Sequence, residues 1–352
     1  MNLISLGWND FWEKQFENYQ QPGFKAGRIA AEYKGIYRVY AEKGEFLAGV
    51  SGKMRYQAAV RDHLPAVGDW VVLRDEDESS PVIHGILPRK SKFSRKMAGK
   101  TTEEQIIAAN VDTVFLVTAL NKDFNLRRIE RYLTLAWESG ANPVIVLSKA
   151  DLCLDLSNKV QNVEAIALGV PVYATSSITG QGMESLESHL GEGRTVALLG
   201  SSGAGKSTLI NRLMGKTAQR TQDIRQGDDR GKHTTTSREL FLLPRGGLVV
   251  DTPGLRELQL WDSHEGFHET FEDVEFYAGQ CRFTDCRHTS EPGCAVKRAI
   301  AEGKLDPARF NHYLKLQKEL AYLSRKENQQ ELLADKARWK KIHKEMKHYK
   351  PR

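Results

Sequence analysis

One stretch near the middle of the chain has the residue types and spacing of a phosphate-binding loop. Gly200-Ser201-Ser202-Gly203-Ala204-Gly205-Lys206-Ser207 matches G-x-x-x-x-G-K-[ST], follows an apolar run over Thr195–Leu199 and precedes a helical pattern over Thr208–Met214. Glycines let successive backbone N–H groups face a phosphate at the positive end of the following helix. We expect Lys206 to reach the β- and γ-phosphates, Ser207 to ligate Mg²⁺, and Thr208 to complete the site.

A second phosphate element is Asp251-Thr252-Pro253-Gly254, which follows the apolar run Leu248–Val250. A carboxylate at a strand end can hold Mg²⁺ through water, and the backbone N–H of Gly254 can sense a γ-phosphate. The polar stretch Gly231–Thr236 lies between the two elements. It is suited to supplying a threonine, Thr234 or Thr235, to Mg²⁺ and to becoming ordered when γ-phosphate is present.

The base is expected to be read by residues earlier in the chain. Ser148-Lys149-Ala150-Asp151 is similar to the [N/T]-K-x-D element of GTPases, in which the aspartate accepts hydrogen bonds from the guanine ring and amine and the lysine stem covers the base. Ser148 departs from the usual Asn, so the bonds that tether this loop, and the affinity for guanine, stay open. Thr175-Ser176-Ser177 suits the companion loop that contacts the guanine oxygen.

These elements must be positioned by strands that alternate with helices. Apolar runs over Val111–Leu120, Pro143–Leu147 and Val170–Tyr173 are separated by helical patterns over Leu126–Glu138 and Asn158–Leu168. Alternation of this kind predicts an α/β domain with a parallel sheet covered on both faces. The guanine elements precede the phosphate elements, so the motif order of a GTPase is circularly permuted, which a doubly wound sheet tolerates because it needs strand positions rather than chain order.

The flanking regions predict two further domains. Residues 23–95 contain short apolar runs separated by turn signals, without a helical period, which favours a small closed OB-type β-barrel after an N-terminal extension over residues 1–22. We assign residues 96–262 to the permuted GTPase domain and residues 263–352 to a metal-binding and basic helical domain.

Three cysteines and a histidine cluster within the last of these segments. Their spacing is C-x4-C-x-H-x5-C, and they are Cys281, Cys286, His288 and Cys294. Three thiolates and one imidazole match a structural zinc tetrahedron, which leaves no open position for catalysis. Disulfides are disfavoured in the cytosol, where we expect the chain to reside, because it has neither a signal-peptide pattern nor an apolar run of about 20 residues that could cross a membrane.

Charge suggests a polyanionic partner. The chain has 352 residues and a net charge of +6, but Lys304–Arg352 alone carries +8 and the remainder −2. A second basic cluster without acidic residues comprises Arg89, Lys90, Lys92, Arg95, Lys96 and Lys100. Nucleic acid is the default partner of such clusters, although a solvated helix face would give the tail the same composition.

The whole arrangement resembles the ribosome small-subunit-dependent GTPase A family. The barrel, the permuted domain and the segment Cys281–His288 with Glu291–Cys294 run in that family's order, and Gly231–Thr236 is similar to its switch string. The resemblance implies GTP and GDP as ligands, an oligonucleotide-binding-type barrel, a zinc domain, and a monomer that contacts rRNA. It also implies a role in late maturation of the small (30S) ribosomal subunit, which would stimulate hydrolysis.

Catalysis needs a group that orients the attacking water, usually a Gln just after D-x-x-G. Leu255 occupies that position and cannot do so, and His233 is the nearest polar candidate. We therefore assign catalytic roles to His233, Lys206 and Asp251, with an exposed loop histidine as the alternative for His233. Two other classes stay open: an adenine-nucleotide P-loop enzyme, which Asp151 argues against, and a non-catalytic RNA-binding assembly factor with a vestigial pocket, which intact Lys206 and Asp251 argue against.

Overall fold

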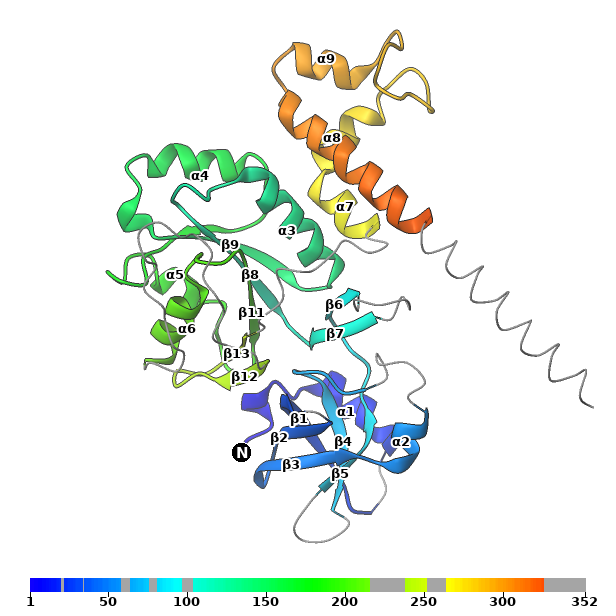
Figure 1. The fold of residues 1–352 in the computed structure, drawn as a ribbon, viewed down its shortest axis with the longest axis vertical. Coiled ribbons are helices and arrows are strands. Elements are labelled where there is room, and N and C mark those ends of the chain that lie inside the picture. Colours follow the sequence, from blue (N-terminus) through cyan, green and yellow to red (C-terminus); the bar gives the residue numbers. More distant parts are fainter. Residues whose placement is uncertain are drawn as a thin grey trace, which may run out of the picture. The chain divides into compact units, whose positions relative to one another are not determined.

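The computed structural model describes residues 1–19, 22–33, 35–57, 64–75, 81–96, 104–215, 238–251 and 264–325 (Figure 1). The described residues up to 251 form one compact unit, and residues 264–325 belong to a second. Within these ranges no helix has the length and apolar character that a membrane span requires.

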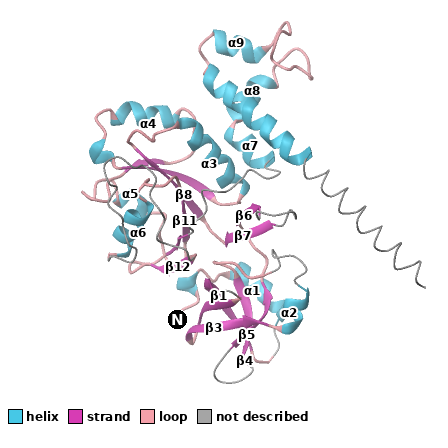
Figure 2. Cartoon of the chain, viewed as in Figure 1, coloured by secondary structure: helices cyan, strands magenta, loops and turns pink. Residues whose placement is uncertain are grey.

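The first strands close into a barrel, drawn in magenta beside the N-terminus in Figure 2. β1 (Phe24–Tyr33) pairs with β2 (Ile36–Ala41) and with β4 (Trp70–Asp75), β2 pairs with β3 (Gly44–Val50), and β5 (Pro81–Ile86) joins β3 to β4. Only the β3–β5 pair is parallel. Because β1 is paired on both sides, the five strands leave no free edge, which confirms the predicted closed barrel.

One expectation for this region is wrong, because a helix does interrupt the strands. α2 (Gly52–Gln57) follows β3, and Ser51 starts it: the Ser51 hydroxyl accepts a hydrogen bond from the Met54 N–H at 3.2 Å. A serine at this position supplies an acceptor for the unpaired N–H groups of the first turn. Six residues are too few to show a helical period in the sequence.

The N-terminal residues pack on the barrel through aromatic contacts. They form η1 (Ile4–Leu6), α1 (Asp10–Phe16) and η2 (Glu17–Tyr19). The rings of Trp8 and Trp70 meet edge to face at 4.8 Å between centroids, and Trp12 is 3% exposed. Such pairs add to the stability that area burial provides.

Six strands of an eleven-stranded sheet carry the predicted nucleotide elements. Their order is β10-β9-β8-β11-β13-β12, and among them only the β12–β13 pair is antiparallel. β12 also pairs with β1, through Glu239 and Ala31, and so continues the sheet into the barrel. The strands are β8 (Thr113–Ala119), β9 (Asn142–Ser148), β10 (Val172–Ala174), β11 (Thr195–Leu199), β12 (Glu239–Leu242) and β13 (Leu248–Asp251). β8, β9 and β10 precede β11, so the strands that lead into the guanine elements come before the strand that leads into the phosphate loop.

Helices cover both faces of this sheet (Figure 1). α3 (Leu126–Glu138) packs against β8 and β9, and α4 (Leu156–Glu164) packs against β10. α5 (Glu184–Glu187) and α6 (Lys206–Met214) contribute to a buried cluster on the sheet, which includes Phe115, Val146, Leu186, Val196 and Leu209. The near-continuous burial of β8, β9 and β11 follows from this two-sided cover.

Arg28 joins the N-terminal residues, the barrel and the sheet. It is 2% exposed and donates hydrogen bonds to the carbonyl oxygens of Leu6, Gly68 (3.3 Å) and Asn110 (2.9 Å). A guanidinium has five N–H donors, so it can satisfy several buried carbonyls at once. Burial lowers the pKa of Arg28 to about 10, against the opposing charges of Asp112 and Asp69.

The predicted basic cluster is partly structural. β6 (Lys92–Lys96) and β7 (Glu104–Ala109) form an antiparallel hairpin just after Arg89. The Arg89 side chain donates to both carboxylate oxygens of buried Asp69, at 2.8 and 2.7 Å. The Lys90 ammonium lies 4.3 Å from the ring centroid of Phe11. These two cations therefore stabilise the barrel end of the unit; Lys100 lies outside the described residues.

The second unit is helical. α7 (His264–Thr270), α8 (Glu272–Ala278) and α9 (Ala295–Ala301) are followed by helical residues 307–325. Its core contains a buried arginine, Arg309. The guanidinium donates hydrogen bonds to both carboxylate oxygens of Asp273, each at 2.7 Å, and to the Thr270 carbonyl oxygen at 2.8 Å. A bidentate pair fixes the last helix against α8.

Candidate functional site

The phosphate loop has the backbone that its glycines allow. Gly203 and Gly205 have φ of +71° and +91°, a region that L side chains rarely adopt. A Cβ on Gly200 would lie 2.2 Å from the Val117 carbonyl oxygen, so only glycine fits there. α6 begins at Lys206, whose ammonium donates to the carbonyl oxygens of Gly200 and Ser201, each at 2.7 Å. The lysine ammonium thus lies against the loop whose backbone would surround the phosphates.

The guanine loop meets this phosphate loop directly. The Ser148 hydroxyl donates to the Ala204 carbonyl oxygen at 2.6 Å, although 56 residues separate them in the sequence. Lys149 has a left-handed backbone (φ +59°), which turns the chain sharply between β9 and the 3₁₀ turn Ala150–Leu152. The Asp151 side chain is exposed. Residues 148–151 and 200–207 therefore converge in space.

The companion loop is fixed beside the guanine loop by backbone hydrogen bonds. The Thr175 N–H donates to the Leu147 carbonyl at 2.8 Å, and the Ala150 N–H donates to the Thr175 carbonyl at 3.0 Å. Thr175 and Ser176 are buried and Ser177 is half-buried. Gly182 (φ +68°) closes the loop, since a Cβ there would lie 2.1 Å from the Ala174 carbonyl oxygen.

The predicted magnesium ligands Ser207 and Asp251 lie on adjacent elements. Asp251 ends β13, which runs parallel to β11, the strand that leads into the phosphate loop, and Ser207 lies in the first turn of α6. A hydroxyl and a carboxylate are oxygen ligands of the kind that Mg²⁺ prefers. His233, Thr234, Thr235 and Gly254 lie outside the described residues.

Sequence reasoning missed Asp123, which lies in the loop after β8. Its carboxylate accepts hydrogen bonds from the Ser201 hydroxyl at 2.7 Å and from the Arg128 guanidinium at 2.5 Å. Burial alone would raise the pKa of Asp123, but these two bonds and the charges of Arg128 and Lys149 lower it below its usual value. A signal was available, because ligand-site residues gather at the carboxyl ends of parallel strands and Asp123 follows such a strand.

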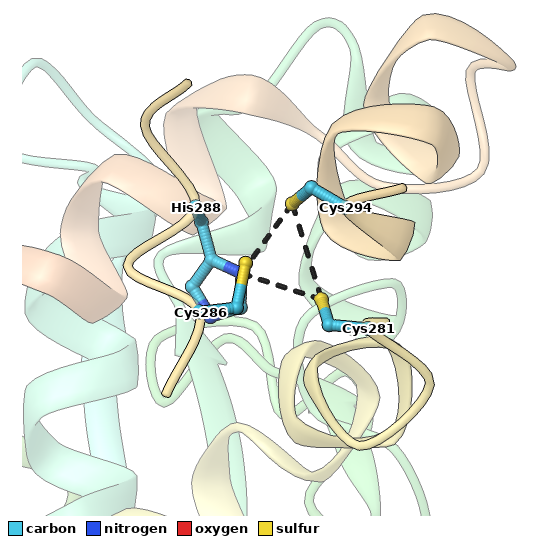
Figure 3. A group of neighbouring side chains, drawn as sticks. All are labelled: Cys281, Cys286, His288 and Cys294. Carbon is cyan, nitrogen blue, oxygen red and sulfur yellow. Dashed lines mark hydrogen bonds between the residues drawn. The ribbon is translucent and has the colours of Figure 1, made fainter. Parts of the chain in front are cut away.

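The four predicted metal ligands of the second unit come together (Figure 3). Their ligand atoms all lie within 4.8 Å of one another. Cys281 Sγ and Cys294 Sγ are 3.9 Å apart, and His288 Nδ1 lies 3.6 and 3.5 Å from them. Tetrahedral zinc with bonds of about 2.3 Å to sulfur and about 2.0 Å to nitrogen would set edges of about 3.8 Å between sulfurs and about 3.5 Å between sulfur and nitrogen. The donor set and its spacing fit such an ion.

Backbone N–H groups surround these thiols. The N–H groups of Ala295 and Lys297, in the first turn of α9, point at Cys281 Sγ (3.3 Å) and Cys294 Sγ (3.5 Å). Outer-shell donors of this kind orient metal ligands. The carboxylate of Glu291 accepts from the N–H groups of Arg287, Thr289 and Ser290 at 3.1, 2.8 and 3.0 Å, which braces the loop that carries His288.

Known proteins are similar to this chain in sequence and in fold. The profile of the family described as RsgA GTPase matches residues 86–261. The "Small ribosomal subunit biogenesis GTPase RsgA" of Opitutus terrae is 48% identical, covering 97% of this chain and 96% of its own. The crystal structure of YjeQ from Thermotoga maritima aligns with a TM-score of 0.64 at 31% identity, over 85% of this chain and 99% of that one. The structure of YloQ, described as a circularly permuted GTPase, aligns with a TM-score of 0.61 at 26% identity, over 86% and 97%.

Sequence, strand order and site geometry agree. The family profile matches half of the chain, and the Opitutus terrae relative is 48% identical over nearly its full length, so the family is shown. Membership makes the chain a GTP hydrolase. The Ser148–Ala204 contact shows that two motifs far apart in the permuted chain lie side by side. This chain belongs to the RsgA GTPase family.

Proposed function

We propose that this chain binds the small ribosomal subunit and hydrolyses GTP to GDP and phosphate during late maturation of that subunit, which stimulates the reaction. The observation that carries the proposal is the 2.6 Å contact between Ser148 and Ala204, which brings the two loops together and supports a single nucleotide site formed by both. The name of the Opitutus terrae relative, a small ribosomal subunit biogenesis GTPase, supports the choice of partner.

Each predicted residue then has a role in the site. Asp151 accepts hydrogen bonds from the guanine edge, and the companion loop Thr175–Ser177 contacts the guanine oxygen. Lys206 leaves the carbonyl oxygens of Gly200 and Ser201 and binds the β- and γ-phosphates. Positioning and charge stabilisation account for most of phosphoryl-transfer catalysis, so a preformed loop supplies much of what the reaction needs.

Two metal ions complete the proposal. Ser207, Asp251 and a threonine at 234 or 235 would hold Mg²⁺, which neutralises charge on the phosphates. Zn²⁺ would occupy the Cys281–Cys294 cluster, one ion per chain, as a structural ion without an open position. Gly254 would sense the γ-phosphate, and His233 would orient the attacking water.

The partner surface is proposed to contact rRNA. The barrel belongs to an architecture that binds oligonucleotides, and the tail after Lys304 carries the excess positive charge. In the second unit, Phe283 is exposed and Arg282 lies over its ring at 5.5 Å, a pairing on which an unpaired base can stack. We propose a cytoplasmic monomer with domains at residues 1–22, 23–95, 96–262 and 263–352.

Phosphate release from GTP, measured with isolated small subunits, with large subunits and with neither, tests this function. We expect slow release alone, strong stimulation by small subunits and none by large ones. A Lys206→Ala variant should lose the stimulated release. Equal rates in all three conditions would exclude the proposed partner, and stronger competition by ATP than by GDP would exclude guanine as the base.

A further inference from the structure

Ser148 is the side chain through which the guanine loop is tied to the phosphate loop. It is buried, and its hydroxyl donates to Ala204 at 2.6 Å, with the Thr118 carbonyl oxygen more distant at 3.4 Å. A hydroxyl has one proton, so it can make one strong bond as a donor. The short bond to Ala204 uses that proton.

A second hydroxyl beside it has no partner among the described residues. Thr175 is 1% exposed, and its Oγ1 is buried without a hydrogen bond. β10 pairs Ala174 with Leu147, so Thr175, the residue after this strand, follows beside Ser148, the last residue of β9. Neighbouring strands lie about 4.8 Å apart, within reach of a longer polar side chain but too far for two hydroxyls on short stems to bond directly unless both turn inward.

The unpaired hydroxyl weakens the closed arrangement of the site. A buried polar group without a partner pays its desolvation cost only while the loops are packed together, and water can satisfy it when they separate. The companion loop is held to the guanine loop by backbone bonds at Leu147 and Ala150. In the proposed site the base lies beside these two loops, so their separation would release it.

We propose that Ser148 is a positioning residue that limits how long the site retains GDP, because its side chain ties only one of the two loops beside it. This inference rests on the proposed guanine-nucleotide binding. An asparagine at this position has two N–H donors and one carbonyl, so it can bond both Ala204 and Thr175.

The test is the release rate of a fluorescent GDP analogue from the full chain, measured by stopped flow. Ser148→Asn should slow release about three- to tenfold, the effect of one added buried hydrogen bond. Ser157→Asn makes the same chemical change at an exposed position of α4 and should leave the rate unchanged. Release from Ser148→Asn at the wild-type rate, or faster, would overturn the inference.

A double-mutant cycle with Thr175→Val tests the proposed partner. Valine replaces the hydroxyl by a methyl group of similar shape, so Ser148→Asn should no longer slow release in this background. Thr175→Val alone should keep or raise the melting temperature, because it removes an unpaired group; a clear decrease would show that the hydroxyl already has a partner and would overturn the inference. A wild-type chain that retains no GDP analogue would instead overturn the proposed function.

Discussion

The hydroxyl of Ser201 donates a 2.7 Å hydrogen bond to the carboxylate of Asp123, which lies 78 residues earlier in the chain. Ser201 is the second residue of the phosphate loop, and its carbonyl oxygen accepts the ammonium of Lys206. The bond to Asp123 uses the Ser201 side chain, whereas the bond to Lys206 uses the Ser201 backbone. The loop after β8 therefore contacts the phosphate loop independently of the lysine.

This contact predicts a pH-dependent contribution to stability. The pKa of Asp123 is lowered in the folded chain, so the carboxylate stabilises the fold above the ordinary carboxyl pKa of about 4 and loses this effect as the pH falls through its lowered value. Asp123→Asn should reduce the free energy of unfolding at neutral pH by about 0.2–1 kcal/mol, a small amount because the Arg128 pair is partly exposed. Urea denaturation between pH 3 and about 8 measures the difference.

The control is Glu187→Gln, which removes the exposed pair with Arg245. It should change the free energy of unfolding by no more than a few tenths of a kcal/mol, the value of a solvated pair. A gap between wild type and Asp123→Asn that widens as the pH falls would contradict the sign derived from the lowered pKa.

Two glycines, Gly169 before β10 and Gly182 at the companion loop, allow the cost of a left-handed backbone to be measured separately from the cost of a steric clash. Gly169 and Gly182 have similar φ, +72° and +68°, but a Cβ on Gly169 has nothing within 4 Å, whereas one on Gly182 would lie 2.1 Å from the Ala174 carbonyl. Gly169→Ala should cost about 1 kcal/mol for the left-handed backbone. Gly182→Ala should cost more and should also weaken GDP binding, because the loop must move away from β10. Equal GDP affinities in the two variants would separate this loop from the nucleotide site.

The shape of the phosphate loop and the grouping of the cysteines could be predicted because both depend on residues close together in the sequence. The phosphate loop depends on glycines at fixed offsets between a strand and a helix, and the helix over Leu126–Glu138 has the bounds that its spacing predicted. The metal cluster was equally readable, because its four ligands lie within one short segment. Strand alternation also predicted the parallel sheet, and the closed barrel followed from short strands with turn signals.

Contacts between distant residues could not be predicted in this way. Arg89 belongs to a basic cluster that predicts nucleic-acid binding, yet its side chain pairs with Asp69, which is buried by the closed barrel. The packing of Trp8 on Trp70 and the bond from Ser201 to Asp123 likewise join segments that only the folded chain brings together. The sequence contains these residue types but not their pairing, because tertiary contacts have no fixed spacing.

Removal of the metal should unfold the second unit selectively. Its helices are short, and the cluster joins the loop of Cys281 and His288 to the start of α9. Cys294→Ser should reduce bound zinc from one equivalent to none and make residues 264–325 sensitive to protease, since a structural metal contributes directly to folding. Cys153→Ser, outside the cluster, should keep the full equivalent. Full zinc content in Cys294→Ser would exclude this site.

His233 should contribute to GTP turnover but not to GTP binding. Leu255 stands where GTPases usually carry a water-orienting glutamine, so another side chain must do this work, and His233 is the polar candidate nearest in the sequence. His233→Ala should bind GTP with unchanged affinity, because base and phosphate contacts come from other residues. Its turnover with small subunits should fall about 10²-fold or more, the usual loss of a positioned catalytic group. Fluorescent-nucleotide titration and single-turnover phosphate release measure the two quantities separately, and undiminished stimulated turnover would remove His233 from the mechanism.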